Sequence, residues 1–209
     1  MAGSTMRLFQ HPGLGPAPRA AGGVAKAIVG SGRAEAGGGR LFGVVTPQIG
    51  LSNRHVVVLT EYPDEARARA GDLFAGLDVG VERHEFWEPD PRPAPGAVIA
   101  EADGFFSHRW WDIAEGDWER FRDLSDGAWG NFEDVHDTRV IGFWRSRTPP
   151  GLGLARVWLM AWYKNLAAWE GSRFYLHRDD ARSAEAYSRF EARGALTLDS
   201  AVSLLRRVT

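Results

Sequence analysis

The stretch TRVIGFW at residues 138–144 decides the fold, because it repeats the pattern of GRLFGVV at residues 39–45. The two stretches share an arginine, Arg139 and Arg40, and a glycine, Gly142 and Gly43. Their β-branched and aromatic side chains are typical of strands. Two matching strands far apart in one chain indicate an internal repeat, and a repeat sets the architecture of the whole chain.

The repeat extends beyond these two strands. Residues 55–62, HVVVLTEY, match residues 156–163, RVWLMAWY, so that Tyr62 corresponds to Tyr163. The loops between the matched strands contain Pro or Gly, which are expected at the turn of a hairpin. We therefore predict that the chain contains two copies of one unit.

The second copy shows the order of elements most clearly. Its pattern predicts a strand at residues 104–112 and then a helix that begins after Asp117. A hairpin of strands at 139–145 and 156–162 follows, and a short helix at 165–172 comes after it. The order up to this point is β-α-β-β-α.

A closing strand would complete the unit. In the first copy, alternating side chains at residues 79–87 predict that strand, which gives the β-α-β-β-α-β order of a ferredoxin-like unit. The second copy ends differently. Residues 181–193 predict a helix that Gly194 stops, and apolar spacing over 198–205 predicts a last short helix. Residues 174–177 fit a stunted closing strand.

The expected fold class is thus α+β, with two tandem ferredoxin-like repeats and extra C-terminal helices. The Pro-rich segment 88–96 is stiff and cannot join a central strand, which makes it the boundary between the copies. We assign residues 1–96 to a first, degenerate repeat. Residues 97–209 form the second repeat, which carries the C-terminal helices.

The best-preserved stretch of the second copy is similar to a known family. Residues 157–170, VWLMAWYKNLAAWE, resemble the signature of NIPSNAP-like members of the dimeric α/β-barrel superfamily. The pairs at 128–129 and 132–133 and the stretch IGFW at 141–144 strengthen the resemblance. It covers the second copy well and the first only faintly, because the Gly-rich and Ala-rich segment 20–39 departs from it.

This resemblance implies two ferredoxin-like units whose sheets face each other as a pseudo-dimeric barrel within one chain. A pocket in each unit is implied as well. The superfamily includes cofactor-independent monooxygenases, polyketide cyclases, lactone isomerases and haem-binding or haem-degrading enzymes. It has no shared catalytic motif, so a function drawn from it is an analogy.

Alternation along residues 156–162 suggests which face of the sheet lines a pocket. Val157, Leu159 and Ala161 form a small apolar face that suits packing beneath helices. We expect the opposite face to be the pocket wall. The predicted substrate-contacting residues are Trp110, Trp129, Phe143, Trp144, Trp158, Met160 and Trp162.

Three residues are the candidates for catalysis. His108 lies among aromatic residues and could act as general acid or base, or merely form a hydrogen bond at a strand end. Arg139 could clamp a carboxylate or an enolate oxygen, or pair with Glu133. Tyr163 could assist proton transfer, or simply close the fold before a helix.

Composition excludes several classes of protein. The chain has 25 Lys and Arg against 27 Asp and Glu, so nothing predicts a nucleic acid or an anionic membrane as partner. The absence of cysteine excludes disulfides, thiolate metal sites and a cysteine nucleophile. The six histidines are scattered without metal-ligand spacing. No apolar stretch reaches the length of a membrane span and no secretory signal is visible, so we expect a cytoplasmic protein.

These observations predict a small-molecule enzyme of specialised metabolism. It would act without a cofactor on an aromatic or polyketide-like substrate by acid–base chemistry, as a cyclase, isomerase or cofactor-independent monooxygenase. Two alternatives stay open: a haem-binding or haem-dependent enzyme with His108 or His177 as axial ligand, and a non-catalytic ligand-binding or oligomeric module. The partners expected are a small hydrophobic or aromatic substrate and, as one option, a second copy in a homodimer.

Overall fold

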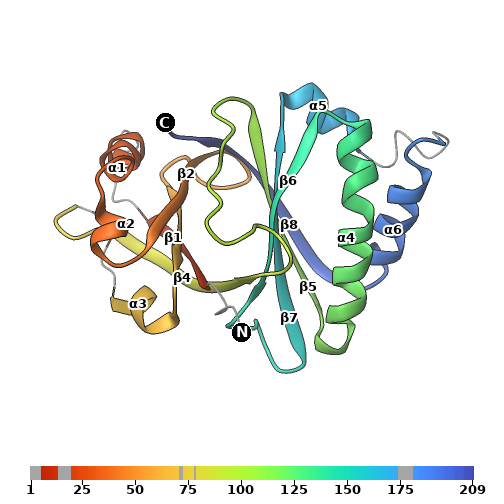
Figure 1. Ribbon diagram of the computed structural model, residues 1–209, viewed down its shortest axis with the longest axis horizontal. Coiled ribbons are helices and arrows are strands. Elements are labelled where there is room, and N and C mark those ends of the chain that lie inside the picture. Colours follow the sequence, from red (N-terminus) through yellow and green to blue (C-terminus); the bar gives the residue numbers. More distant parts are fainter. Residues whose placement is uncertain (1–5, 14–19, 71–72, 78, 174–180) are drawn as a thin grey trace.

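The computed structural model describes residues 6–13, 20–70, 73–77, 79–173 and 181–209. Within these residues, eight antiparallel strands close into a barrel in the order β1-β3-β2-β8-β5-β7-β6-β4 (Figure 1). Their bounds are β1 Met6–Gly13, β2 Arg40–Ile49, β3 Val57–Tyr62, β4 Gly80–Pro89, β5 Phe105–Ala114, β6 Thr138–Ser146, β7 Leu154–Tyr163 and β8 Thr197–Arg207.

The barrel consists of two halves with the same connectivity. Strands β1 to β4 lie in the order β4-β1-β3-β2, and strands β5 to β8 in the order β8-β5-β7-β6. In each half the first strand lies between the fourth and the third, which is the arrangement of a β-α-β-β-α-β unit. The halves join where β4 pairs with β6 and β2 pairs with β8.

A β-bulge occurs at the matched glycine of each half. The pairing register of β2 with β3 shifts between Leu41 and Gly43, and that of β6 with β7 shifts between Val140 and Gly142. A bulge bends a strand and increases its local twist, which suits strands that curve around a barrel. The two glycines that are equivalent in the sequence thus lie at equivalent irregularities in the sheet.

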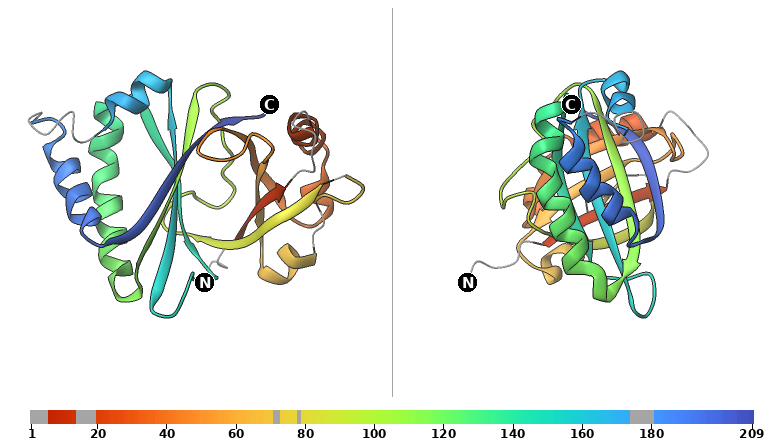
Figure 2. Two further views of the ribbon diagram at one scale, coloured as in Figure 1. Left: turned by 180° about the vertical axis from the view of Figure 1, so that it is seen from behind. Right: turned by 90° about the vertical axis from the view of Figure 1, so that its right-hand side faces the viewer.

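Helices cover the outer faces of the two halves. Three short ones, α1 (Ala20–Ile28), α2 (Arg33–Ala36) and α3 (Glu65–Ala70), accompany the first half. Over the second half, α4 (Trp118–Val135) and α6 (Ala184–Gly194) lie side by side on the outer face of the sheet (Figures 1 and 2). Helix α5 (Leu166–Gly171) follows β7, and a 3₁₀ turn at Glu115–Asp117 precedes α4. No helix in the described ranges is both long and apolar enough to cross a membrane.

The end of the chain corrects one prediction. The helix expected at 181–193 is present as α6, but the last short helix expected between Leu198 and Leu205 is wrong, because these residues form strand β8. Apolar residues spaced by three and four fit a helix locally. Pairing with β5 and β2 overrides that local preference. The stunted strand expected at 174–177 falls outside the described residues.

The sheet separates two large apolar clusters. The cluster beneath α4 and α6 contains Val157, Leu159 and Ala161 of β7, so the predicted helix-facing side of this strand is confirmed. The cluster inside the barrel contains Trp158 and Met160 from the other side of the same strand. Alternation along one strand therefore supplies both cores.

Candidate functional site

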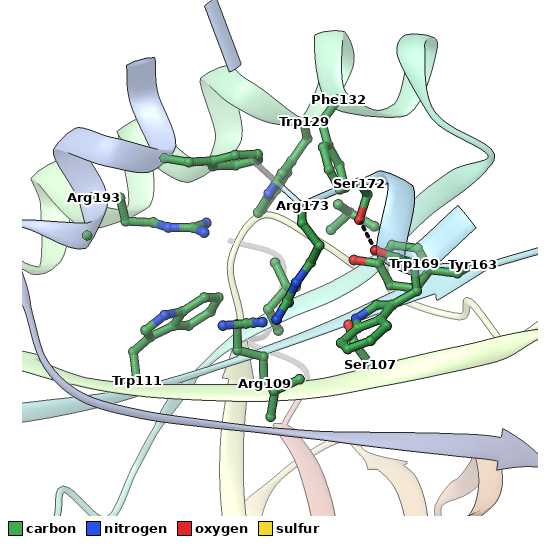
Figure 3. Close-up of a pocket in the computed structure, with 15 residues that line it drawn as sticks. Ser107, Arg109, Trp111, Trp129, Phe132, Tyr163, Trp169, Ser172, Arg173 and Arg193 are labelled. Carbon is green, nitrogen blue, oxygen red and sulfur yellow. Dashed lines mark hydrogen bonds between the residues drawn. The ribbon is translucent and has the colours of Figure 1, made fainter. Parts of the chain in front are cut away.

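A cavity of about 340 Å³ lies between the outer face of the second sheet and helices α4 to α6 (Figure 3). This volume is at the lower end of the range for small-molecule sites. The sheet contributes Ser107, Arg109 and Trp111 of β5, Val140 of β6, Leu159 and Tyr163 of β7, and Val202 of β8. The helices and the segment after α5 contribute Trp129, Phe132, Trp169, Ser172, Arg173, Phe190, Arg193 and Gly194.

Local periodicity explains why these side chains meet. Ser107, Arg109 and Trp111 alternate along β5 and therefore point to the same, helix-covered face. Phe190 and Arg193 are three residues apart in α6 and share the helix face that packs on the sheet. Asn165 caps α5 by accepting a hydrogen bond from the backbone N–H of Ala168 at 2.8 Å, which fixes the turn after β7.

Arg109, Arg173 and Arg193 direct their guanidinium groups into the same space (Figure 3). Within the part of the chain that the structure describes, none of the three forms an ion pair with a carboxylate. They lie against aromatic rings instead. The guanidinium carbon of Arg193 is 4.6 Å from the centre of the Trp111 ring, and that of Arg173 is 4.5 Å from the Trp169 ring.

Burial makes the charge on two of these groups costly. Loss of hydration lowers the pKa of Arg193 to about 9, and repulsion from Arg109 acts in the same direction. Loss of hydration also lowers the pKa of Arg109 from its ordinary value, with repulsion from Arg173 as a smaller contribution. A pKa of about 9 leaves Arg193 protonated at neutral pH, and a guanidinium group ordinarily keeps its proton there, so the cavity carries positive charge in a space with little hydration.

Tyr163 is the aromatic hydroxyl group of the cavity. It lies at the end of β7, is buried, and lines the cavity together with Arg109 and Arg193 (Figure 3). A phenol hydroxyl can both donate and accept a hydrogen bond. Beside two cations, it can therefore transfer a proton to or from a bound molecule whose negative charge those cations stabilise.

Two of the residues predicted from the sequence, Trp129 and Tyr163, line this cavity. His108 does not, because it projects from the opposite face of β5 into the barrel. There it is buried, with its ring edge-on to Trp158 at a centroid distance of 5.0 Å. Arg139 is on the surface and pairs with Glu101 at 2.7 Å, not with Glu133. His177 lies outside the described residues.

The pocket wall expected on the other face of β7 does not line this cavity and stays a prediction. Trp158 and Met160 are fully buried inside the barrel, and the Trp158 ring stacks on Trp144 with centroids 4.0 Å apart and planes 16° apart. Partly buried Trp162 packs against this cluster. The described cavity lies on the opposite face of β7, which carries the smaller apolar residues and faces the helices.

The remaining two predicted contacts belong to other layers. Phe143 is buried beneath α4, where it stacks on Trp118 with planes 12° apart. Trp110 lies under the guanidinium of Arg156 at 4.4 Å, and Arg156 forms two hydrogen bonds of 2.7 Å with the carboxylate of Asp112. Both rings are structural contacts of the described fold and neither lines the cavity.

Sequence reasoning missed the three arginines. Arg109 shares a strand face with Trp111, and attention to His108 selected the opposite face of the same strand. Arg193 follows Ala186 and Phe190 on the buried stripe of α6 at helical spacing. A charged residue on an apolar stripe was therefore the available signal, because unpaired charges are rarely buried without a role.

Comparison with known proteins agrees with this architecture. No family model matches the chain, and no curated protein matches it. An anthrone oxidase-like protein superposes with a TM-score of 0.65 at 10% identity, covering 99% of this chain and 92% of that one. A Lactobacillus acidophilus protein provisionally named a monooxygenase gives 0.60 at 9% identity, covering 99% and 95%.

A mutant chlorite dismutase from Candidatus Nitrospira defluvii gives a TM-score of 0.59 at 7% identity, covering 100% of this chain and 93% of that chain. The chain has the dimeric α/β-barrel fold. The predicted barrel fold is thus confirmed. The resemblance to NIPSNAP-like members stays a prediction. Dimeric α/β-barrel proteins differ in chemistry, and at identities this low the likeness shows the fold alone.

The dimeric α/β-barrel fold raises the question of haem, because haem enzymes share it. Among the described residues, the cavity lining contains no His, Cys or Met that could be an axial ligand of the usual kinds. The described chain also holds no cluster of three potential metal-ligating side chains. Tyr163 is a possible haem ligand of a less common kind in the described lining. Haem binding, with His108 or His177 as axial ligand, stays a prediction.

Proposed function

We propose that this dimeric α/β-barrel protein is an enzyme that acts by proton transfer on a small aromatic or polyketide-like substrate. The observation that carries the proposal is a cavity with aromatic walls in which a tyrosine hydroxyl lies near two unpaired guanidinium groups. No metal or nucleotide is assigned to the reaction. A cyclase, an isomerase and a cofactor-independent monooxygenase all begin with such a proton transfer.

The walls of the cavity would hold the substrate. Trp111, Trp129 and Phe132 line the cavity with aromatic side chains, which suit contact with a planar ring system. Excluding water between these rings strengthens every electrostatic interaction within the cavity. Binding would thus place the substrate where the charged groups act most strongly.

Tyr163, Arg109 and Arg193 would perform the chemistry. When a proton moves between the substrate and the Tyr163 hydroxyl, negative charge develops on a substrate oxygen or on the phenol. The guanidinium groups of Arg109 and Arg193 stabilise that charge because they already lie in the cavity and need not reorganise. Preorganised donors of this kind lower the barrier for enolate formation and for its reversal.

The names of two structural neighbours support the reaction class. One is an anthrone oxidase-like protein and another is provisionally named a monooxygenase. An anthrone is a fused aromatic ketone, which is the type of molecule that flat apolar walls accommodate. The described cavity belongs to the second half of the barrel, so we further propose that the halves arose as copies of one unit and that the second one carries the active site.

Turnover of a panel of hydroxylated anthrones and naphthalenones tests the proposal. We expect Tyr163→Phe to lower kcat/KM by about 100-fold or more, the usual contribution of a positioned acid or base. Tyr62→Phe is the matched control, because Tyr62 holds the equivalent position of the first half and lies in a different, small cluster with Ala68 and Phe86. Full activity of Tyr163→Phe would remove the assignment.

His108 is the competing candidate from the sequence, and the same assay decides between the two. If His108 acts as acid or base from inside the barrel, His108→Gln loses turnover and Tyr163→Phe retains it. The haem alternative is tested separately by adding haemin and looking for a shifted Soret band, and a non-catalytic module would bind the panel compounds without turning them over.

A further inference from the structure

We propose that the molecule bound in this cavity enters it already negatively charged, as an aromatic carboxylate or an ionised phenol or enol. Arg109 and Arg193 would hold its oxygen atoms. This inference rests on the site of the proposed function, but it concerns the charge of the substrate before reaction and not the proton transfer itself.

The charge balance of the cavity is the first argument. Arg109, Arg173 and Arg193 contribute three positive charges, and the other polar side chains of the lining are Ser107, Ser172 and Tyr163. None of the described lining residues is Asp or Glu. Cations gathered in a dehydrated space repel one another, so an anion is the complementary ligand.

Other arginines of the chain show how different this cluster is. Arg156 forms a two-point pair with Asp112, Arg92 pairs with Glu133 at 2.7 Å, and Arg139 pairs with Glu101 at 2.7 Å. Those guanidinium groups are neutralised within the fold. In the cavity, by contrast, Arg109 and Arg193 form no ion pair with a described carboxylate, so their charge can be neutralised by a ligand.

Arg193 is held in position for this role. Its Nη1 atom donates a hydrogen bond of 3.3 Å to Ser125 Oγ, and its guanidinium lies 4.7 Å from the Phe190 ring and 4.6 Å from the Trp111 ring. Trp111 also contacts Arg109, whose guanidinium carbon is 5.8 Å from the ring centre. A donor group positioned before binding loses little freedom on binding, which favours affinity.

The walls determine what the anion is attached to. A small inorganic anion would neutralise the arginines but would leave most of the 340 Å³ of this largely aromatic-lined cavity without contact. A flat ring bearing one oxyanion fills both parts. A planar carboxylate can also accept two parallel hydrogen bonds from the planar fork of a guanidinium.

The test compares an aromatic anion with a neutral isostere and with a small anion that has no ring. Calorimetry on the full chain measures the dissociation constants of 2-naphthoate, of its neutral isostere 2-naphthamide, and of inorganic phosphate. We expect naphthoate to bind about 10-fold or more tightly than the amide, the range of hydrogen bonds to charged groups. Phosphate is expected to bind far more weakly than naphthoate. Equal binding of naphthoate and amide would overturn the proposal, and so would phosphate binding as tight as that of naphthoate.

Variants then assign the preference to the cavity. Arg193→Met and Arg109→Met should each reduce the naphthoate-to-amide ratio towards one. Arg189→Met is the matched control from the same helix, because Arg189 pairs with Glu185 and does not line the cavity. If Arg189→Met lowers the ratio as much as Arg193→Met, the proposal fails. Arg193→Lys guards against misfolding, since it keeps the charge and should retain part of the preference.

The outcome is separable from that of the proposed function. Tyr163→Phe should lose turnover and keep the naphthoate preference, whereas Arg193→Met should lose the preference even with a compound that the enzyme cannot convert. If the unsubstituted protein binds naphthoate and the amide equally and still turns over neutral substrates, the charged-ligand inference alone is overturned. A strong preference together with full activity of Tyr163→Phe would overturn the proton-transfer assignment alone.

Discussion

The guanidinium of Arg193 lies 4.6 Å from the centre of the Trp111 ring, on a helix face that otherwise presents apolar side chains to the sheet. A ring face attracts a cation but does not replace its hydration or a carboxylate partner. The fold therefore tolerates a destabilising charge at the point where we propose that substrate binds. Such local cost is characteristic of binding sites, where function and stability oppose each other.

Replacing Arg193 by Met should stabilise the protein while it removes anion binding. The flexible apolar side chain keeps the contacts with Trp111 and Phe190 and eliminates a dehydrated charge, for a gain of about 1 kcal/mol. In a chain of this length, that corresponds to a rise in Tm of about 2–4 °C. Differential scanning calorimetry measures it, with Arg189→Met as the surface control. A fall in Tm for Arg193→Met would contradict the argument.

Anion binding should weaken in alkaline solution. The pKa of Arg193 is lowered to about 9, so its guanidinium is protonated at pH 7 and loses its proton as the pH rises through that value. A carboxylate probe stays ionised over the whole range. The dissociation constant of 2-naphthoate should thus be constant between about pH 6.5 and 8 and increase above about pH 9.

The same lowered pKa has a consequence for folding. The unfolded chain keeps an ordinary arginine pKa. The charge on Arg193 therefore lowers the free energy of unfolding by its full amount below about pH 9, and this destabilisation decreases as the pH rises above that value. Arg193→Met should lack both pH effects. An affinity of the unsubstituted protein that stays constant up to about pH 10.5 would refute the assigned pKa.

The stacked pair Trp144 and Trp158 should give a distinct optical signal. Rings 4.0 Å apart with planes 16° apart couple their transitions, so a circular dichroism couplet is expected that disappears in Trp158→Leu. Trp158 is also fully buried, and its truncation should cost about 3 kcal/mol in urea unfolding. Trp169→Leu is the control, because Trp169 contacts Arg173 and should leave the couplet in place.

Glycine is required at one of the two matched bulges more than at the other. A Cβ atom at Gly142 would lie 2.1 Å from the Trp144 ring, which is held by stacking, whereas at Gly43 it would meet the end of the Ile99 side chain at 2.5 Å. Gly142→Ala should therefore cost about 2 kcal/mol and Gly43→Ala clearly less. Gly130→Ala in α4 meets nothing within 4 Å and should stabilise by about 0.5–1 kcal/mol. Urea unfolding of the three variants provides the comparison.

Most of the strands and helices could be predicted from the sequence. Matching strands around Gly43 and Gly142 and the alternation along β7 predicted strand positions and the face beneath the helices, because side-chain period is a local property of the backbone. The C-terminal strand could not be predicted, because the spacing of Leu198 and Leu205 also fits a helix. Only pairing with β5 decides between a helix and a strand.

Sequence alone thus determined the strand and helix order through most of both halves, the α+β class and the two-sided character of β7. Tertiary structure decided which residues line the described cavity. How Trp144, Trp158 and Met160 pack inside the barrel depends on how two sheets curve towards each other, and whether Arg109 meets Arg193 depends on how α6 lies across β5. Both arrangements depend on side-chain volumes and on distances between segments far apart in the chain, and no local sequence pattern encodes them.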